Sequence, residues 1–235
     1  MDPKPEFRAH LKARRDALPA DSRIAWSAAI AGQLERLCRN RRFTRIGAFW
    51  PLGSEIDLRS AVSDHPDWLW FFPRVASTQP PRLVWGTEPL EKGHWGLMEP
   101  ALAQHFLPPV QLLLVPGLAF DDEGYRIGYG RGFYDALLSK LPEEVFTVGV
   151  GFEAQMHLSV PVEPHDWPVQ ALLSERGLRQ VEVGGWRYRF LRRPSAASFF
   201  SLWDRLSGGS APTQKTSAAQ SAATESSASG LQPPA

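Results

Sequence analysis

A strand, a glycine-rich turn and a helix start follow one another in residues 111–135, and this order constrains the fold more than any other feature. Residues 112–115 form an uninterrupted apolar run closed by a Pro-Gly pair, which is typical of a strand buried on both faces. Residues 128–132 (GYGRG) come next, and residues 133–138 have the composition of a helix start. Glycines let backbone N–H groups approach an anion, and a helix N-terminus favours negative charge. The sequence therefore predicts a phosphate-binding loop between a buried strand and a helix.

The spacing within this loop excludes two standard phosphate motifs. The loop runs G-x-G-x-G, whereas the dinucleotide fingerprint runs G-x-G-x-x-G, and a P-loop needs Lys-Ser/Thr where this chain has Phe133. A glycine-rich turn that only joins strand to helix is the alternative. Arg126 and Arg131 favour phosphate binding because they bring cations to a place where amides already point. Asp135 adds a carboxylate suited to Mg²⁺.

The segment RIGYGRGFYD, residues 126–135, resembles the nucleotide loop of the 5-formyltetrahydrofolate cyclo-ligase (5,10-methenyltetrahydrofolate synthetase) family, usually R-L-G-x-G-x-G-Y-Y-D. Phe133 stands where the family usually has its first tyrosine, and Arg131 where it often has lysine. The resemblance implies that Arg131 is catalytic through the transferring phosphate and that Asp135 holds Mg²⁺. The loop residues it implies for ATP binding are Arg126, Ile127, Gly128, Tyr129, Gly130, Arg131, Gly132, Phe133 and Tyr134.

Residues 4–18 are predicted to form a short helix with one apolar stripe, and Lys4, Arg8 and Arg15 line an adjacent face. The pattern alone is typical of a solvated basic face. The motif Lys4-x-x-Phe7-Arg8, however, resembles the family's N-terminal K-x-x-L-R, whose basic residues reach the nucleotide phosphates. The resemblance therefore implies that Lys4 and Arg8 bind ATP.

Two further segments resemble the family's folate-binding parts. Residues 49–57 (FWPLGSEID) begin in the last residues of a predicted strand, and Glu55 stands just past the turn that ends it. Taken alone, Glu55 would more often be an exposed loop residue or a charge at a helix start. The segment matches the family's substrate segment, whose glutamate hydrogen-bonds the pterin edge. Residues 93–100 (GHWGLMEP) have no regular period, are predicted to be a loop, and match a segment whose aromatic residue flanks the folate pocket. The substrate-binding set implied by these matches is Trp50, Glu55, Trp95, Met98, Tyr129 and Phe133.

A histidine–aspartate pair lies between prolines in residues 160–169. Such a pair beside prolines usually belongs to an ordinary loop without a ligand, although it could ligate a metal. The segment resembles the family's H-D-x-P-V, whose aspartate assists Mg²⁺ beside the loop aspartate. The resemblance thus implies that Asp166 joins Asp135 in holding Mg²⁺, and it leaves His165 as a structural residue.

Strands and helical segments alternate in units of about thirty residues, which indicates an α/β fold with a mostly parallel sheet and helices on both faces. The resemblance, which spans about residues 4–174, implies an open three-layer α/β sandwich of the type shared with ribose-phosphate isomerases and CoA transferases. After a second helix that starts near residues 19–21, the predicted strands are 45–50, 68–72 (ended by Pro73), 82–85, 112–115, 145–151 and 172–174, with an edge hairpin over 181–190.

We expect one α/β domain over residues 1–194 and a linker or short docking helix over 195–207. Residues 208–235 have no aromatic side chain and are mostly Ala, Ser, Thr, Gln, Gly and Pro. That composition cannot bury enough apolar surface to order a chain, so it predicts a disordered C-terminal tail.

Composition narrows the class of protein further. A formal net charge of +1 gives no reason to expect nucleic acid or an anionic membrane as partner. The single cysteine, Cys38, excludes an internal disulfide and a cysteine-based zinc site, and it suits a reducing compartment. The N-terminal residues lack an apolar signal core, and no apolar window reaches membrane-spanning length. We therefore expect a soluble cytoplasmic protein, acting as a monomer on small molecules.

The activity implied by the resemblance is the ATP- and Mg²⁺-dependent conversion of 5-formyltetrahydrofolate to 5,10-methenyltetrahydrofolate, with release of ADP and phosphate. Two alternatives stay open. One is a sugar-phosphate isomerase or acyltransferase on the same fold, because fold does not fix function. The other is a non-catalytic regulator that binds nucleotide or folate, which the departures at Arg131 and Phe133 would permit.

Overall fold

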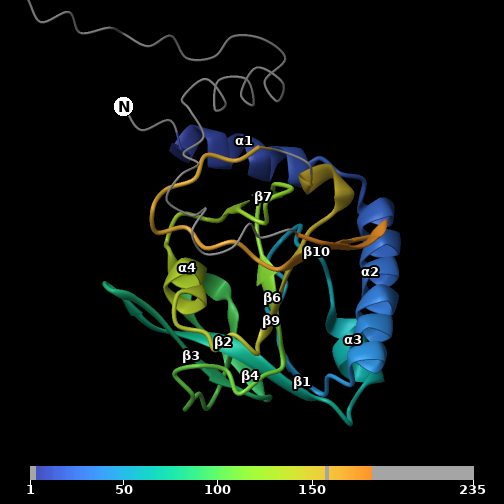
Figure 1. Cartoon of the computed structure of the whole chain (residues 1–235), viewed down its shortest axis with the longest axis vertical. Coiled ribbons are helices and arrows are strands. Elements are labelled where there is room, and N and C mark those ends of the chain that lie inside the picture. Colours follow the sequence, from blue (N-terminus) through green and yellow to red (C-terminus); the bar gives the residue numbers. More distant parts are fainter. Residues whose placement is uncertain (1–3, 157–158, 182–235) are drawn as a thin grey trace, which may run out of the picture.

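A seven-stranded sheet forms the centre of the computed structural model, which describes residues 4–156 and 159–181 (Figure 1). The strands are β1 (Arg45–Gly47), β2 (Leu69–Thr78), β3 (Pro81–Gly86), β6 (Leu112–Pro116), β9 (Phe146–Val150), β10 (Ala171–Ser174) and β11 (Gly177–Gln180), in the order β11-β10-β9-β6-β1-β2-β3. The five inner strands are parallel to one another, and only the edge strands β3 and β11 pair antiparallel. The predicted α/β fold with a mostly parallel sheet is confirmed.

Helices cover both faces of this sheet. The α-helices of the described residues are α1 (Lys4–Asp16), α2 (Ala20–Arg41), α3 (Arg59–Asp64) and α4 (Phe133–Leu138). The central strand β6 alternates between the two faces: Leu112 and Leu114 pack with residues of α2 and α3, while Leu113 and Val115 pack with residues of α4. Figure 1 shows α2 and α3 on one side of the sheet and α4 on the other. The uninterrupted apolar run is therefore buried on both faces of the sheet, as predicted.

Helix α1 closes a third, smaller core at one end of the sheet, beside β7 (Ala119–Phe120) (Figure 1). Phe7 and Leu11 of α1 pack there against Leu118 and against Ile127 of β8 (Arg126–Ile127). Leu118 lies just beyond the carboxyl end of β6, and β8 leads directly into the glycine loop. The apolar stripe predicted from the sequence therefore places α1 over the carboxyl end of the sheet.

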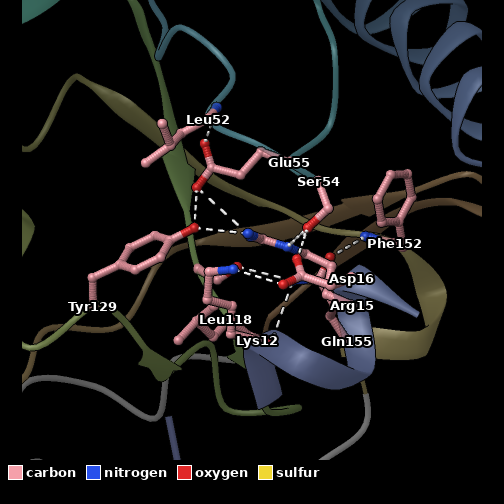
Figure 2. Close-up of polar contacts among 11 residues, drawn as sticks. Lys12, Arg15, Asp16, Leu52, Ser54, Glu55, Leu118, Tyr129, Phe152 and Gln155 are labelled. Atoms are coloured by element: carbon pink, nitrogen blue, oxygen red, sulfur yellow. Dashed lines mark hydrogen bonds and ion pairs between the residues drawn. The ribbon is translucent and has the colours of Figure 1, made fainter. Parts of the chain in front are cut away.

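The chain reverses its direction of strand addition between β1 and β6. From β1 it proceeds to β2 on one side, and it later returns to β6, β9 and β10 on the other. In open α/β sheets, ligands bind outside the carboxyl ends of the strands at such a switch point. Buried Gln155 braces this region, since its Nε2 donates hydrogen bonds to the carbonyl oxygens of Gly117 (2.9 Å) and Leu118 (3.2 Å) (Figure 2).

The prediction that Pro73 ends a strand is wrong, because β2 continues through it to Thr78. Pro73 faces Trp85 of β3 in the antiparallel pair. Trp85 uses its own backbone groups on its other side, where its N–H donates to the carbonyl of His105 (2.8 Å) and its carbonyl accepts from Gln104. The Pro73–Trp85 pair is thus a position without ladder hydrogen bonds, where a missing N–H has no consequence.

Two other local predictions need correction. Residues 93–100 are not wholly a loop, because β5 (Met98–Pro100) pairs antiparallel with β4 (Leu90–Lys92) around a short 3₁₀ turn, η1 (His94–Gly96). One of the two antiparallel edge strands is β11, which the sequence analysis did not predict.

Several predictions fall outside the described part of the chain. Apart from residue 181, the predicted hairpin over 181–190 lies there, as do the segment 195–207 and the tail 208–235. Across the described residues, no helix combines the length and apolar character needed to cross a membrane.

Candidate active site

A cavity of about 440 Å³ opens where the segment that follows β1, the η1 turn with β5, and the carboxyl end of β6 meet the glycine loop. That volume lies within the range of about 300–1,000 Å³ that is usual for small-molecule sites. The side chain of Lys4 is outside what the structure describes. Every other predicted site residue lines the cavity, namely Arg8, Trp50, Glu55, Trp95, Met98, Arg126, Ile127, Gly128, Tyr129, Gly130, Arg131, Gly132, Phe133, Tyr134, Asp135 and Asp166.

The glycine loop is shaped by two left-handed glycines and by the side chain of Arg8. Gly130 has φ +88° and Gly132 has φ +68°, a region that other residues rarely adopt. A Cβ at Gly130 would lie 3.0 Å from the guanidinium carbon of Arg8, so the arginine packs directly on the loop. The Arg8 Nε is buried and has no hydrogen-bond partner among the described residues. A buried, unpaired cationic nitrogen beside loop amides is suited to receive an anion.

Arg126 is nearly buried, with 4% of its side chain exposed, and both of its amino nitrogens donate hydrogen bonds within the protein. One amino nitrogen donates to the carbonyl of Trp167 (3.0 Å) and the other to Oδ1 of Asp135 (3.0 Å), which also accepts from the Trp167 N–H (3.2 Å). Asp135 Oδ2 makes no hydrogen bond to a described residue. Arg126 therefore orients Asp135 through Oδ1 and leaves Oδ2 available to a ligand.

A second carboxylate group stands beside Trp167. Ligand atoms of Glu163, His165 and Asp166 all lie within 4.8 Å of one another at the cavity wall. The Asp166 Oδ2 accepts from the Glu163 N–H (2.6 Å), and His165 Nε2 lies 3.3 Å from Glu163 Oε2. Carboxylate oxygens are the ligands that Mg²⁺ prefers, so the carboxylates of this group suit that ion. Asp135 lines the same cavity but does not belong to this group. The sequence analysis did not single out Glu163, and a lone glutamate in a proline-rich loop gives no strong signal.

Arg131 and Trp95 form a stacked pair at the cavity. The guanidinium carbon of Arg131 lies 4.1 Å from the centroid of the Trp95 ring. The Phe133 ring is tilted against the same tryptophan, with the two ring centroids 6.3 Å apart. Trp95 itself has φ 54° and is 49% exposed. A bulky residue in the left-handed region carries strain of about 1–3 kcal/mol, which proteins retain mainly at functional sites. Arg131 pairs with no carboxylate among the described residues, so its charge is available to an anion.

Arg15 contacts two residues that line the cavity, and the sequence analysis gave it no role in the site. It is only 3% exposed, so the expectation of a solvated basic face is wrong for it. Its Nε donates to Ser54 Oγ (2.9 Å), one amino nitrogen donates to the Tyr129 hydroxyl (2.9 Å), and the other lies 3.6 Å from Glu55 Oε1 (Figure 2). The signal was present, because Arg15 shares the spacing of Lys4 and Arg8 on α1.

Two hydrogen bonds hold the Glu55 carboxylate beside Arg15. Its Oε1 accepts from the Tyr129 hydroxyl (2.6 Å) and its Oε2 from the Leu52 N–H (3.0 Å). Burial raises the pKa of Tyr129 above its usual range, and the neighbouring Glu55 raises it further. The hydroxyl therefore stays protonated at neutral pH and donates a hydrogen bond to the carboxylate. The site thus presents a fixed carboxylate, aromatic surfaces and a cationic glycine loop to one cavity.

Glu99 is a second buried carboxylate at this cavity that the sequence analysis missed as a site residue. It is 1% exposed, and its Oε1 accepts from the Val75 N–H (3.2 Å) while Oε2 lies 3.4 Å from His94 Nδ1. A Cβ at Gly93 would lie 2.1 Å from Glu99 Oε2, so only glycine leaves room for this carboxylate. Glu99 therefore fixes the turn that carries Trp95.

Residues 1–175 match the model described as the 5-formyltetrahydrofolate cyclo-ligase family. The chain belongs to the 5-formyltetrahydrofolate cyclo-ligase family. The fold and the identification made from the glycine loop are thereby confirmed, and the chain is an enzyme of a ligase family that acts on a folate.

Individual relatives agree with this family. A 5-formyltetrahydrofolate cyclo-ligase of Mus musculus is 26% identical over 191 residues, which cover 72% of this chain and 92% of the relative. That of Mycolicibacterium smegmatis is 28% identical over 190 residues, covering 74% and 95%. The NMR structure of Aquifex aeolicus 5,10-methenyltetrahydrofolate synthetase superposes with a TM-score of 0.66 at 29% identity, covering 77% of this chain and 93% of that one.

Proposed function

We propose that this chain catalyses the ATP- and Mg²⁺-dependent conversion of 5-formyltetrahydrofolate to 5,10-methenyltetrahydrofolate, with release of ADP and phosphate. The observation that carries the proposal is that one cavity is lined both by a cationic glycine loop and by Glu55 among aromatic side chains. The first set suits a triphosphate, and the second suits a flat heterocycle with N–H donors. We further expect the enzyme to act as a monomer in the cytoplasm, with reduced folate and ATP as its substrates.

The chemistry follows from the poor leaving ability of a formamide oxygen. We expect the formyl oxygen of the substrate to attack the γ-phosphorus of ATP, which forms an O-phosphorylated intermediate and releases ADP. The N10 nitrogen then attacks the formyl carbon and closes the ring, and N10 gives its proton to water. Departure of phosphate with the C–O bonding pair leaves the methenyl cation. Phosphoryl transfer of this kind requires charge neutralisation and alignment more than covalent help.

Each side chain has a role in this scheme. Arg131 neutralises the transferring phosphoryl group, and Arg8, Lys4 and the loop amides hold the rest of the triphosphate. Arg126 acts through Asp135, which it orients. Asp135 and Asp166 would hold Mg²⁺, which when bound supplies further charge neutralisation of the phosphates.

The folate side uses fixed surfaces. Glu55 would accept hydrogen bonds from the pterin, and it is preorganised for this by Tyr129 and the Leu52 N–H. Trp50 is held by the core, since its ring packs edge-on to Phe72 with centroids 5.6 Å apart. Met98, Trp95 and Phe133 would supply apolar contact to the rings of the substrate.

The test is product formation by the purified chain. The methenyl product absorbs in the near ultraviolet, where 5-formyltetrahydrofolate does not, so its appearance can be followed directly. The proposal expects an absorbance rise that requires both ATP and Mg²⁺, with one phosphate released per product. Tight binding of ATP or folate without any rise would instead favour a non-catalytic binding protein.

Gly130→Ala is expected to raise the KM for ATP about tenfold, because the left-handed backbone strains an alanine and its Cβ displaces Arg8. Initial rates at varied ATP measure this effect. Gly32→Ala is the matched control, since nothing lies within 4 Å of a Cβ there and its φ is not positive. A Gly130→Ala variant whose KM rises for folate and not for ATP would contradict the assignment of the loop to the nucleotide.

A further inference from the structure

We propose that Arg15 is a positioning residue that holds the folate-side carboxylate Glu55 and the glycine-loop hydroxyl of Tyr129 in one fixed arrangement. The proposal rests on the function proposed above, because it uses the assignment of Glu55 to folate and of the loop to ATP. Arg15 does not line the cavity, so it acts through residues that do.

Three separate parts of the chain meet at the Arg15 guanidinium, as Figure 2 shows. Arg15 lies on α1, Ser54 and Glu55 follow β1, and Tyr129 belongs to the glycine loop. Each guanidinium nitrogen has a different neighbour, and the contacts to Ser54 and Tyr129 span 39 and 114 residues of sequence. The planar fork of an arginine can satisfy three directions at once, whereas a lysine ammonium cannot match that geometry.

The charges at this junction are buried and depend on one another. The side chains of Arg15 and Glu55 are 2% and 8% exposed, and Arg15 is the cation that pairs with Glu55 among the described residues. Removal of one partner from such a pair leaves an uncompensated charge away from water, which the remaining partner avoids by moving. Without Arg15, we therefore expect Glu55 and Tyr129 to lose their shared position.

A chain of hydrogen bonds anchors Arg15 from the protein surface. Ser54, which accepts from Arg15, donates to Asp16, and Lys12 donates to Asp16 Oδ2 (2.6 Å). The hydrogen bonds from Lys12 and Ser54 hold the pKa of Asp16 below its usual value, so this anchor is charged at neutral pH. Lys12, Asp16 and Arg15 all lie on α1, so the helix itself is fixed to the segment after β1.

Helix α1 thereby contacts the glycine loop twice. Arg8 packs on Gly130, and Arg15, two helical turns later, donates to Tyr129. The same helix holds Glu55, so its docking sets the separation between the nucleotide loop and the folate carboxylate. A misplacement of about 1 Å between reacting groups can lower a rate about 100-fold. The consequence of losing Arg15 should therefore appear mainly in kcat and in the KM for folate.

The experiment compares Arg15→Gln with Arg14→Gln, which removes the neighbouring but exposed arginine of the same helix. We expect Arg15→Gln to lower kcat about 100-fold and to raise the KM for folate several-fold, with the KM for ATP within about twofold of wild type. Arg14→Gln should match wild type in all three. Arg15→Lys, which restores charge without the fork, should recover part of the loss, and circular dichroism checks that each variant is folded.

A double-mutant cycle distinguishes a positioning role of Arg15 from a general loss of structure. If Arg15 acts through the Tyr129 hydroxyl, the loss in Arg15→Gln/Tyr129→Phe should be smaller than the product of the two single losses. Multiplicative losses, a KM for ATP that rises as much as that for folate, or an Arg15→Gln variant equal to Arg14→Gln would each overturn the proposal. Should Arg15→Gln fail to fold, Ser54→Ala removes one anchor and should give the same kcat and folate pattern at smaller size.

Failure of this proposal can be told apart from failure of the proposed function. If the wild-type chain forms no methenyl product, the proposed function fails. Binding of 5-formyltetrahydrofolate is then measured by quenching of the fluorescence of the nine tryptophans. The positioning role requires that Arg15→Gln bind this folate about tenfold more weakly than Arg14→Gln does, and equal affinities would overturn it.

Discussion

Replacement of Arg131 by alanine is expected to lower kcat about 1,000-fold, since arginines that neutralise a transferring phosphoryl group contribute at least that factor in other enzymes. Arg131 lies against the cavity with no carboxylate partner among the described residues, and its guanidinium stacks on Trp95 at 4.1 Å. The stacking fixes a side chain that would otherwise be free, so little order has to be gained when ATP arrives. The measurement is steady-state methenyl formation at saturating ATP and folate.

Arg82→Ala is the matched control for this change. Arg82 also places its guanidinium over an aromatic ring, that of Phe106 at 5.6 Å, but it does not line the cavity. Its removal should leave kcat within about twofold of wild type. Arg131→Lys keeps the charge and should fall between the two. An Arg131→Ala variant that retains a tenth of wild-type kcat would show that another cation carries the transferring phosphate.

The fold was predictable where local sequence sets both secondary structure and burial. The run Leu112 to Val115 is apolar at every position, and its shortness and the Pro-Gly pair that closes it favour a strand covered on both faces. That single inference leads to a parallel sheet with helices on each side. The stripe of α1 was equally informative, because Phe7 and Leu11 must face something apolar.

The local errors arise where pairing partners decide the outcome. Pro73 is acceptable within β2 because Trp85 directs its hydrogen bonds elsewhere, and no pattern around Pro73 reveals this. The edge strand β11 has alternating exposure, with Leu178 and Gln180 outward, and it becomes a strand only by pairing with β10. Propensity is a weak guide at such positions because tertiary contacts determine the pairing.

The same reasoning explains which parts of the site were predictable. The loop residues from Arg126 to Asp135 are contiguous, so a motif in the sequence keeps them together in space. Arg15 could not be assigned in that way, because its partner Tyr129 lies 114 residues further along the chain. Arg126 was predicted to bind ATP, but its guanidinium already donates to Asp135 and to the carbonyl of Trp167. No pattern in the sequence indicates these contacts.

Asp135→Asn is expected to lower kcat about 100-fold and to raise the Mg²⁺ concentration for half-maximal activity at least tenfold, since a bound metal supplies several kcal/mol to charge stabilisation. Asparagine keeps the shape of the side chain, and its Oδ1 can still accept from Arg126 and from the Trp167 N–H. The substitution therefore removes the charge that a cation needs while it preserves the contacts that orient the group. Methenyl formation measured across a Mg²⁺ titration gives both quantities.

The control must remove the charge of another aspartate that pairs with an arginine, without touching the cavity. Asp57→Asn does so, because Asp57 pairs with Arg59 on the surface and does not line the site. It should leave the Mg²⁺ requirement unchanged. If Asp135→Asn lowered kcat but followed the wild-type Mg²⁺ curve, Asp135 would be a structural partner of Arg126 only. The metal would then have to be held by the carboxylates of Glu163 and Asp166, and Asp166→Asn, rather than Asp135→Asn, would shift the titration.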